Sequence, residues 1–284
     1  MIELHNVNFH YTGGTNAGGL TDINLTIPDG QVILFCGQSG CGKTTLTRLV
    51  NGLIPNYYEG DLSGEVLLNG ENISTLPLYQ TAKYVGSVFQ NPRTQFFTID
   101  TTSELAFGSE NQGLPEADIV QRIYATTECF SVKKLLGKNI FQLSGGEKQK
   151  IACASVSVTD PQVIVLDEPS SNLDITATKD LRGMIEIWKS QGKTIIVAEH
   201  RLYYLSGLFD RVLYLKDRAV YLQDGRIAAD FSGQEMKLLS GEKLKEMGLR
   251  SFELSQYPIK HVRPLDNEVI TLSDFYFAYQ KDKA

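Results

Sequence analysis

Short apolar runs recur along the chain and alternate with longer stretches whose apolar positions are spaced as on a helix. This alternation is typical of an α/β fold with a largely parallel central sheet. Near the start of the chain, Ile2–Phe9 and Asp22–Ile27 alternate apolar and polar residues, which predicts a small antiparallel sheet. The core strands are predicted at Val32–Cys36, Tyr84–Phe89, Val163–Asp167, Thr194–Ala198 and Val212–Leu215.

The segments between and after these strands predict a wider organisation. Residues around 101–140 are polar and have few strand signals, so we expect a helical insertion over about 95–160. A C-terminal helical extension is expected over 231–250. Residues 251–268 contain Pro258 and Pro264 with little periodicity, which indicates a linker.

One internal repeat follows that linker. The opening pattern I-E-L-H-N-V-N-F-H-Y (Ile2–Tyr11) returns as I-T-L-S-D-F-Y-F-A-Y (Ile270–Tyr279). These are either unrelated amphipathic strands or the same strand in two copies of one domain. On the second interpretation, residues 269–284 are the first strand of a truncated second domain, since no second phosphate loop occurs before Ala284.

Composition restricts where the protein works. No apolar run approaches the roughly 20 residues that cross a bilayer, and the N-terminus lacks a signal-peptide pattern. The formal net charge of −6 argues against a nucleic-acid-binding surface. The spacing of the cysteines predicts neither a metal site nor disulfides, which favours a reducing cytosol, with any membrane reached through partners. They are Cys36, Cys41, Cys129 and Cys153.

The segment after the strand V-I-L-F-C matches a phosphate-binding loop, G-x-x-x-x-G-K-[ST]. Its glycines let backbone N–H groups turn toward phosphate oxygens, and a helix beginning at Lys43 directs its positive end at the same anion. Lys43 can reach the β- and γ-phosphates, and the Thr44 hydroxyl is placed for Mg²⁺. The predicted nucleotide-binding residues of the loop are Gly37, Gln38, Ser39, Gly40, Cys41, Gly42, Lys43, Thr44 and Thr45.

A pair of acids ends the apolar strand V-I-V-L-D-E-P. Asp167 is predicted to hold Mg²⁺, because this ion prefers hard oxygen ligands. Glu168 is predicted to orient or deprotonate the attacking water. Adjacent acids are often only a solvated strand end, but the phosphate loop upstream favours the catalytic interpretation.

The string L-S-G-G-E-K-Q-K (Leu143–Lys150) resembles the signature of ABC ATPases, which other phosphate-loop enzymes lack. Locally, Ser144 is predicted to cap a helix whose N-terminus forms an anion site. The resemblance implies that Ser144, Gly145, Gly146 and Glu147 complete the ATP site of a second nucleotide-binding domain. A capped helix without that role has the same local pattern.

Further positions resemble that family over residues 1–230, the expected ABC ATPase domain. By resemblance, Tyr11 stacks on adenine, and Gln90 senses Mg²⁺ and the lytic water. Asp174 resembles the D-loop residue at the dimer interface, and His200 the switch histidine at the γ-phosphate. The implied cofactors are ATP and Mg²⁺, and the implied partner is a second nucleotide-binding domain.

Two positions depart mildly from the family pattern. Cys41 lies within the phosphate loop and is expected to make the protein sensitive to thiol reagents. Asn172 replaces the alanine often found in the D-loop. Neither change removes a group that the chemistry requires, so we expect an active ATPase rather than a non-enzymatic binding module.

The segments Gln90–Phe97, Glu104–Asn111 and Asn51–Val66 resemble energy-coupling-factor importer ATPases, in particular two-domain members. The resemblance implies a membrane coupling subunit, a small substrate-binding membrane subunit and no nucleic acid. It also implies a peripheral location on the cytoplasmic face of the cell membrane, with a vitamin, vitamin precursor or metal ion as cargo. The alternative is a soluble tandem ATPase of the translation-factor type. A DNA-repair ATPase is disfavoured because no long coiled coil separates the phosphate loop from the signature.

Overall fold

A computed structural model describes residues 1–12, 18–219 and 222–250, and the side chains of 217–224 are not described. All of these residues belong to one unit, Met1–Glu253. The predicted linker over 251–268 and the strand over 269–284 lie outside the described residues.

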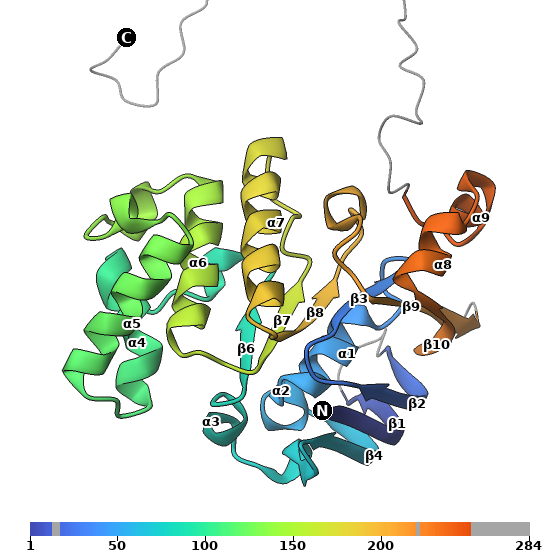
Figure 1. Cartoon of the computed structure of the whole chain (residues 1–284). Coiled ribbons are helices and arrows are strands. Elements are labelled where there is room, and N and C mark those ends of the chain that lie inside the picture. Colours follow the sequence, from blue (N-terminus) through green and yellow to red (C-terminus); the bar gives the residue numbers. More distant parts are fainter. Residues whose placement is uncertain (13–17, 220–221, 251–284) are drawn as a thin grey trace, which may run out of the picture. The chain divides into compact units, whose positions relative to one another are not determined.

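The strands and helices alternate in the core of this unit, as the sequence predicts (Figure 1). The strands are β1 (Ile2–Tyr11), β2 (Gly19–Ile27), β3 (Val32–Gly37), β4 (Gly60–Leu68), β5 (Glu71–Asn72), β6 (Val85–Val88), β7 (Val163–Asp167), β8 (Thr194–Ala198), β9 (Arg211–Ala219) and β10 (Leu222–Ser232). The α-helices are α1 (Lys43–Val50), α2 (Leu53–Asn56), α3 (Leu78–Thr81), α4 (Thr101–Asn111), α5 (Glu116–Cys129), α6 (Gly145–Val158), α7 (Ile175–Ser190), α8 (Gly233–Leu238) and α9 (Gly241–Glu246). Single 3₁₀ turns occur at Ile73–Thr75, Pro92–Thr94, Lys133–Leu135, Ile140–Gln142 and Tyr203–Leu205.

The described strands form one sheet in the order β5-β4-β1-β2-β10-β9-β3-β8-β7-β6. Strands β9, β3, β8, β7 and β6 pair in parallel and make the core. Strands β1, β2, β4 and β5 pair antiparallel, as predicted for the start of the chain. They do not form a separate sheet, however, because β2 pairs with β10 at Gly19 and Leu20.

Alternate residues of β3 face two different apolar cores. Val32, Leu34 and Cys36 belong to the core under α6 and α7, whereas Ile33 and Phe35 belong to the core under α1. A central parallel strand is covered on both faces, so every residue of β3 is buried. This burial fixes the end of β3 at Gly37, where the predicted phosphate loop begins.

Helices α4, α5 and α6 gather beside the β6 edge of the sheet, within the predicted helical segment (Figure 1). Helices α8 and α9 lie within residues 231–250. The predicted bounds of β7 and β8 are confirmed, and β9 is longer than predicted. Strands β4, β5 and β10 were not predicted. In the described part of the chain, no helix has the length and apolar character needed to span a bilayer.

Candidate nucleotide site

The loop between β3 and α1 has the backbone that a phosphate cradle requires. Gly42 has a φ of 94°, and a Cβ atom there would lie 2.6 Å from Leu20 Cδ2. A Cβ atom on Gly37 would lie 2.3 Å from the Leu215 carbonyl oxygen. Both positions therefore need glycine, for conformation and for space. Helix α1 begins directly after Gly42, so its free N–H groups face the loop.

Lys43 turns back over this loop. Its Nζ donates to the carbonyl oxygens of Gly37 and Gln38, at 3.1 and 2.9 Å. The side chain is almost fully buried, with 4% of the residue exposed. A buried ammonium group is stabilised by such acceptors, and a phosphate oxygen is a stronger one. The contacts hold the predicted phosphate-binding cation inside the cradle.

Thr44 and Asp167 meet across the sheet end. The Thr44 hydroxyl donates to Asp167 Oδ1 at 3.0 Å. Burial raises the pKa of the Asp167 carboxyl above its ordinary value of 3.8, although the Thr44 hydrogen bond opposes this shift. A hydroxyl and a carboxylate facing each other are hard oxygen donors of the kind that Mg²⁺ prefers. These two residues fit the predicted metal site.

The predicted catalytic side chains converge on Glu168. Gln90 Nε2 donates to Glu168 Oε2 at 3.1 Å, and His200 Nε2 lies 3.2 Å from Glu168 Oε1. Glu168 has a φ of 44°, which is uncommon for a residue other than glycine. This backbone separates Glu168 from its neighbour Asp167, which instead contacts Thr44. In this structure Gln90 contacts the predicted catalytic carboxylate, and its role at the metal stays a prediction.

His200 is half-buried, and this changes its titration. Burial lowers the pKa of the imidazole below its ordinary value of 6.5, and Lys43 acts in the same direction. Glu168 and Glu199 partly oppose the shift. The histidine is therefore neutral at physiological pH, so one ring nitrogen can accept and the other donate.

Tyr11 lies beside the phosphate loop and is held by its hydroxyl. It donates to Thr45 Oγ1 at 3.3 Å and accepts from Arg48 Nη1 at 2.9 Å. The Arg48 guanidinium also lies 3.8 Å from the ring centroid of Tyr58. A cavity of about 180 Å³ separates Tyr11 from Lys43, Thr44 and Glu168. Tyr11 is therefore placed to border a nucleotide bound in that cavity.

The predicted signature begins helix α6. Ser144 Oγ accepts from the Glu147 backbone N–H, and Glu147 Oε2 accepts from the Ser144 N–H, which forms a capping box. The predicted N-cap is confirmed. Neither these two residues nor Gly145 and Gly146 line the cavity beside Lys43. The structure does not bring the signature to the site on this chain.

Asp174 has a clear local role. Its Oδ1 accepts from the Ala177 N–H at 2.7 Å and so caps helix α7. This cap fixes the end of the 168–174 loop, which begins at the predicted catalytic carboxylate of Glu168. Its predicted place at a dimer interface stays a prediction.

Comparison with known proteins shows where this site occurs. A model of the ABC transporter family matches residues 20–171, more than half of the chain. The chain belongs to the ABC transporter family. It is an ABC ATPase domain, and the predicted fold class is confirmed by the solved structures of ABC cassettes that it resembles.

The relatives are longer than this chain. An ABC transporter ATP-binding protein of Treponema denticola is 46% identical over 278 residues, which are 98% of this chain and 55% of that protein. A second protein of this description from the same organism is 37% identical over 287 residues, 57% of its length. The ABC ATPase chain therefore spans little more than half the length of these relatives.

Two solved structures resemble the ABC ATPase domain. One is cbiO1 from Clostridium perfringens, part of the ABC transporter complex cbiONQ, with 28% identity and a TM-score of 0.70. The alignment covers 83% of this chain and 89% of that one. The other is a dimeric post-hydrolysis state of the ATP-binding cassette MJ0796 bound to ADP and Pi, with 21% identity and a TM-score of 0.68. The alignment covers 82% of this chain and 98% of that one. At 21% identity this similarity is evidence for the fold alone.

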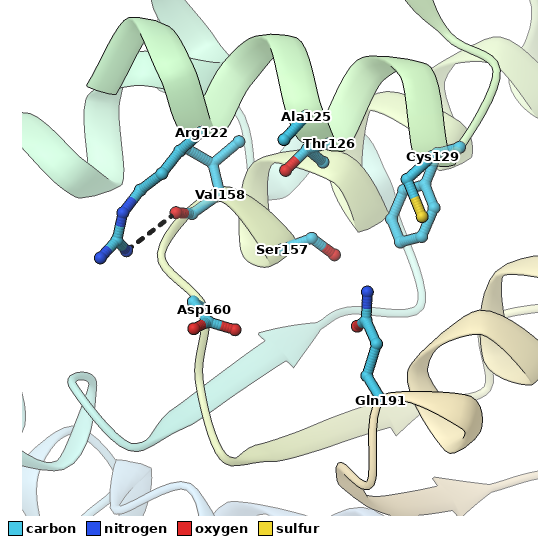
Figure 2. A pocket seen from close by; sticks show the side chains of 9 residues that line it. Arg122, Ala125, Thr126, Cys129, Ser157, Val158, Asp160 and Gln191 are labelled. Atoms are coloured by element: carbon cyan, nitrogen blue, oxygen red, sulfur yellow. Dashed lines mark hydrogen bonds between the residues drawn. The ribbon is translucent and has the colours of Figure 1, made fainter. Parts of the chain in front are cut away.

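A separate cavity of about 410 Å³ lies among the helices of the ABC ATPase domain (Figure 2). It is bordered by Arg122 and Cys129 of α5, the end of α6 at Val158, and Gln191 after α7. Arg122 Nη1 donates to the Val158 carbonyl oxygen at 3.3 Å across its edge (Figure 2). None of the predicted site residues lines this cavity, so the nucleotide chemistry lies elsewhere.

Sequence reasoning missed several residues of the ABC ATPase site. Arg48 and Tyr58 brace Tyr11, although the sequence analysis assigns a role to neither side chain. Glu199 and Arg201 flank His200 and contact the loop after Glu168. A signal existed for the acid, since Glu199 directly follows a strand whose residues are all buried.

Proposed function

We propose that this chain hydrolyses ATP to energise import of a small nutrient across a membrane. The observation that carries the catalytic half of the proposal is the convergence of Gln90 and His200 on the Glu168 carboxylate. Phosphoryl transfer needs a positioned water and stabilised charge more than it needs covalent chemistry. A carboxylate held by two side chains beside a phosphate cradle supports that chemistry.

In this mechanism the Lys43 ammonium group binds phosphate oxygens and the loop N–H groups cradle them. Thr44 and Asp167 would hold Mg²⁺, which neutralises phosphate charge when bound. Glu168 accepts a proton from the attacking water or orients it, and Gln90 and His200 fix the carboxylate. Tyr11 borders the adenine side.

The signature supports a second nucleotide-binding domain as partner. A larger cavity of about 640 Å³ opens beyond Glu168 and is lined also by Gln38 and His200. Since Ser144–Glu147 of this chain do not line either cavity at the site, we infer that another domain's signature covers the nucleotide. ATP would then stabilise a closed pair of domains and hydrolysis would release it.

Glu168→Gln tests this reaction. The variant keeps the shape of the side chain but accepts a proton poorly, so ATP hydrolysis should fall by about a hundredfold or more. ATP binding should persist, and the closed dimer should accumulate on sedimentation with ATP. Glu186→Gln, an exposed change on α7, is the control. Undiminished hydrolysis in Glu168→Gln would remove Glu168 from its role.

The importer part of the proposal names the partners as an integral membrane coupling subunit and a small substrate-binding membrane subunit. A groove of about 350 Å³ supports a docking site, since Tyr79, Phe97 and Phe107 line it. It is also lined by Ser87 and Gln95, which lie on either side of Gln90 in the sequence. Phe97 is 74% exposed and stacks on Phe107, with ring centroids 4.7 Å apart. Exposed aromatic side chains around a groove are typical of protein interfaces.

The solved structure that belongs to the complex cbiONQ supports the same assignment, by similarity of 28% identity. We therefore propose a peripheral location on the cytoplasmic face of the cell membrane. The cargo would be a vitamin, a vitamin precursor or a metal ion, selected by the membrane subunit.

We also propose that residues 1–230 are the ATPase domain, with the helical insertion over about 95–160, and that 231–250 extend it. In this arrangement 251–268 form a linker and 269–284 begin a second ABC domain. The repeat of Ile2–Tyr11 at Ile270–Tyr279 supports it, as do relatives about twice as long. A soluble tandem ATPase of the translation-factor type shares this organisation but would bind ribosomes instead of membrane proteins.

A further inference from the structure

Glu199 is a buried acid beside the catalytic histidine, with 2% of the residue exposed. Its Oε1 accepts from the backbone N–H groups of His200 and Arg201, at 2.7 and 2.9 Å. Its Oε2 accepts from the Ser170 N–H at 3.3 Å and from the Tyr204 hydroxyl at 3.0 Å. A buried carboxylate is costly unless its oxygens are satisfied, and these donors come from two segments of the chain.

Arg201 reaches the same second segment from the other side of His200. Its Nη1 donates to the carbonyl oxygens of Ser170 and Leu173, at 3.2 and 3.1 Å. Its Nη2 donates to the Ser171 carbonyl oxygen at 3.4 Å. The planar guanidinium group therefore holds several carbonyls of one loop at once.

This loop, residues 170–174, joins the catalytic Glu168 to helix α7. It also lies near the signature, because a Cβ atom on Gly145 would be 3.8 Å from the Asn172 carbonyl oxygen. Movement of the loop away from its present position would remove the Ser170 donor from Glu199 and leave carbonyl groups without the Arg201 donor. A buried polar group that loses its hydrogen-bond partner is destabilised, so such a movement of the loop is opposed.

We propose that Glu199 and Arg201 are positioning residues that couple the segment 199–201 to the loop 170–174. Because His200 lies between them, a shift of this loop moves His200 relative to Glu168. This inference rests on the proposed ATP hydrolysis at this site, and it explains what holds His200 in its position beside Glu168. Through this coupling, contacts made by the 170–174 loop would set the efficiency of the chemical step.

Glu199→Gln breaks the link with little change in volume. A glutamine side chain offers one oxygen and one NH₂ group in place of two acceptor oxygens. If the glutamine oxygen still accepts hydrogen bonds from the backbone N–H groups of His200 and Arg201, the glutamine NH₂ group faces the Ser170 N–H. Both of these groups are donors, so no hydrogen bond forms between them. The hydrogen bond from Ser170 to residue 199 is then lost in the variant, which weakens the connection between the two segments, while the hydrogen bonds from Arg201 to the loop remain.

The full chain is assayed with MgATP. In Glu199→Gln we expect kcat to fall by about tenfold or more while KM for ATP changes by less than about twofold. Asp210→Asn is the matched control, because Asp210 also ties two segments, accepting from the Val32 N–H and from Lys189 Nζ at the far end of β3. That variant should lose thermal stability and keep kcat.

The double variant Glu199→Gln with His200→Ala separates positioning from general destabilisation. If Glu199 acts through His200, the double variant is no slower than His200→Ala alone. Hydrogen exchange supplies a readout without turnover: exchange should rise in both 168–174 and 199–204 in Glu199→Gln, and in neither in Asp210→Asn.

Three results would overturn the proposal. The first is a kcat of Glu199→Gln within about twofold of wild type, and the second is a double variant in which the losses of the two single variants multiply fully. The third is unchanged hydrogen exchange in both segments of Glu199→Gln. Failure of the proposed function looks different. In that case wild type and Glu168→Gln hydrolyse ATP equally, whereas the exchange measurement still tests the coupling.

Discussion

At the scale of single residues, the site contains buried ionisable side chains that destabilise the fold when no nucleotide is bound. Asp167 is an acid at the end of a buried strand, and burial raises the pKa of its carboxyl. Lys43 is an almost fully buried cation that donates to carbonyl oxygens. Both side chains lower the free energy of unfolding of the nucleotide-free protein. Their charges complement a ligand that carries Mg²⁺ and phosphate groups.

Asp167→Asn should therefore stabilise the nucleotide-free protein. The folded-state pKa of Asp167 lies above its ordinary value of 3.8. Between these two pKa values the native state binds more protons than the unfolded state, so the free energy of unfolding falls as the pH rises through this interval. The asparagine variant lacks this loss, and its advantage should grow as the pH rises from 3.8 through the folded-state pKa of Asp167 and then level off. Each 1 kcal/mol gained would raise Tm by about 2–4 °C.

Thermal unfolding with and without MgATP measures the effect. The stabilisation that MgATP gives to wild type should be much reduced in Asp167→Asn, because the carboxylate ligand is gone. Thr178→Ser, a buried change on α7 outside the site, is the control. An Asp167→Asn variant less stable than wild type at neutral pH without nucleotide would contradict the prediction.

At the scale of elements, the described part of the chain contains two capping boxes of the same composition. Ser144 and Glu147 begin α6, and Ser232 and Glu235 begin α8, with reciprocal side-chain to backbone bonds in each. Ser144→Ala and Ser232→Ala should each cost about 1 kcal/mol of stability. Only the first change lies in the signature, so only Ser144→Ala should also lower ATP hydrolysis, by about tenfold or more.

The two variants are compared by chemical denaturation and by steady-state ATPase rate. Equal loss of stability with unequal loss of rate is the expected result. If both variants lose activity in proportion to stability, the signature is only a helix start and its role in a partner's site is wrong.

Elements whose burial is local in sequence could be predicted, and others could not. Strands β7 and β8 are short apolar runs buried along nearly their whole length, so their bounds follow from composition. Strand β4 buries only Val66 and Leu68, and Gly64 sits with a φ of 83° against a bulge in β1. Its strand character depends on pairing with β1, from Tyr11 opposite Gly60 to Ile2 opposite Leu68. Such a contact between distant segments leaves no periodic signal in the sequence of β4 itself.

The site shows the same division. Phosphate-loop, carboxylate and signature residues stand in fixed spacings along the chain, so motifs located them. Glu199 and Arg201 act by contacts with Ser170 and Leu173, some 30 positions earlier. Arg48 reaches Tyr11 across 37 positions. Such partners become visible only when the sheet brings β7 beside β8 or β1 beside α1.

At the scale of the whole molecule, the proposed import function requires that closure of the nucleotide site be transmitted to a membrane partner. The groove lined by Phe97 and Phe107 is also lined by Gln95, which follows Gln90 closely in the sequence, and Gln90 contacts Glu168. A partner bound in this groove would therefore be separated from the predicted catalytic carboxylate by one short segment of the chain. This placement supports transmission between nucleotide and membrane subunit through residues 90–97.

Phe97→Ser should weaken that assembly. Wild-type protein purified from detergent-solubilised native membranes is expected to bring a coupling membrane protein and small hydrophobic partners, identified by mass spectrometry. In the variant their yield should fall by about tenfold or more, because a buried aromatic anchor at an interface contributes about 2 kcal/mol or more. Tyr124→Ser, at a 54% exposed aromatic on α5, is the matched control and should retain them. Recovery of ribosomes without membrane proteins would overturn the importer assignment and leave the ATPase standing, whereas equal yields from both variants would move the docking site away from this groove.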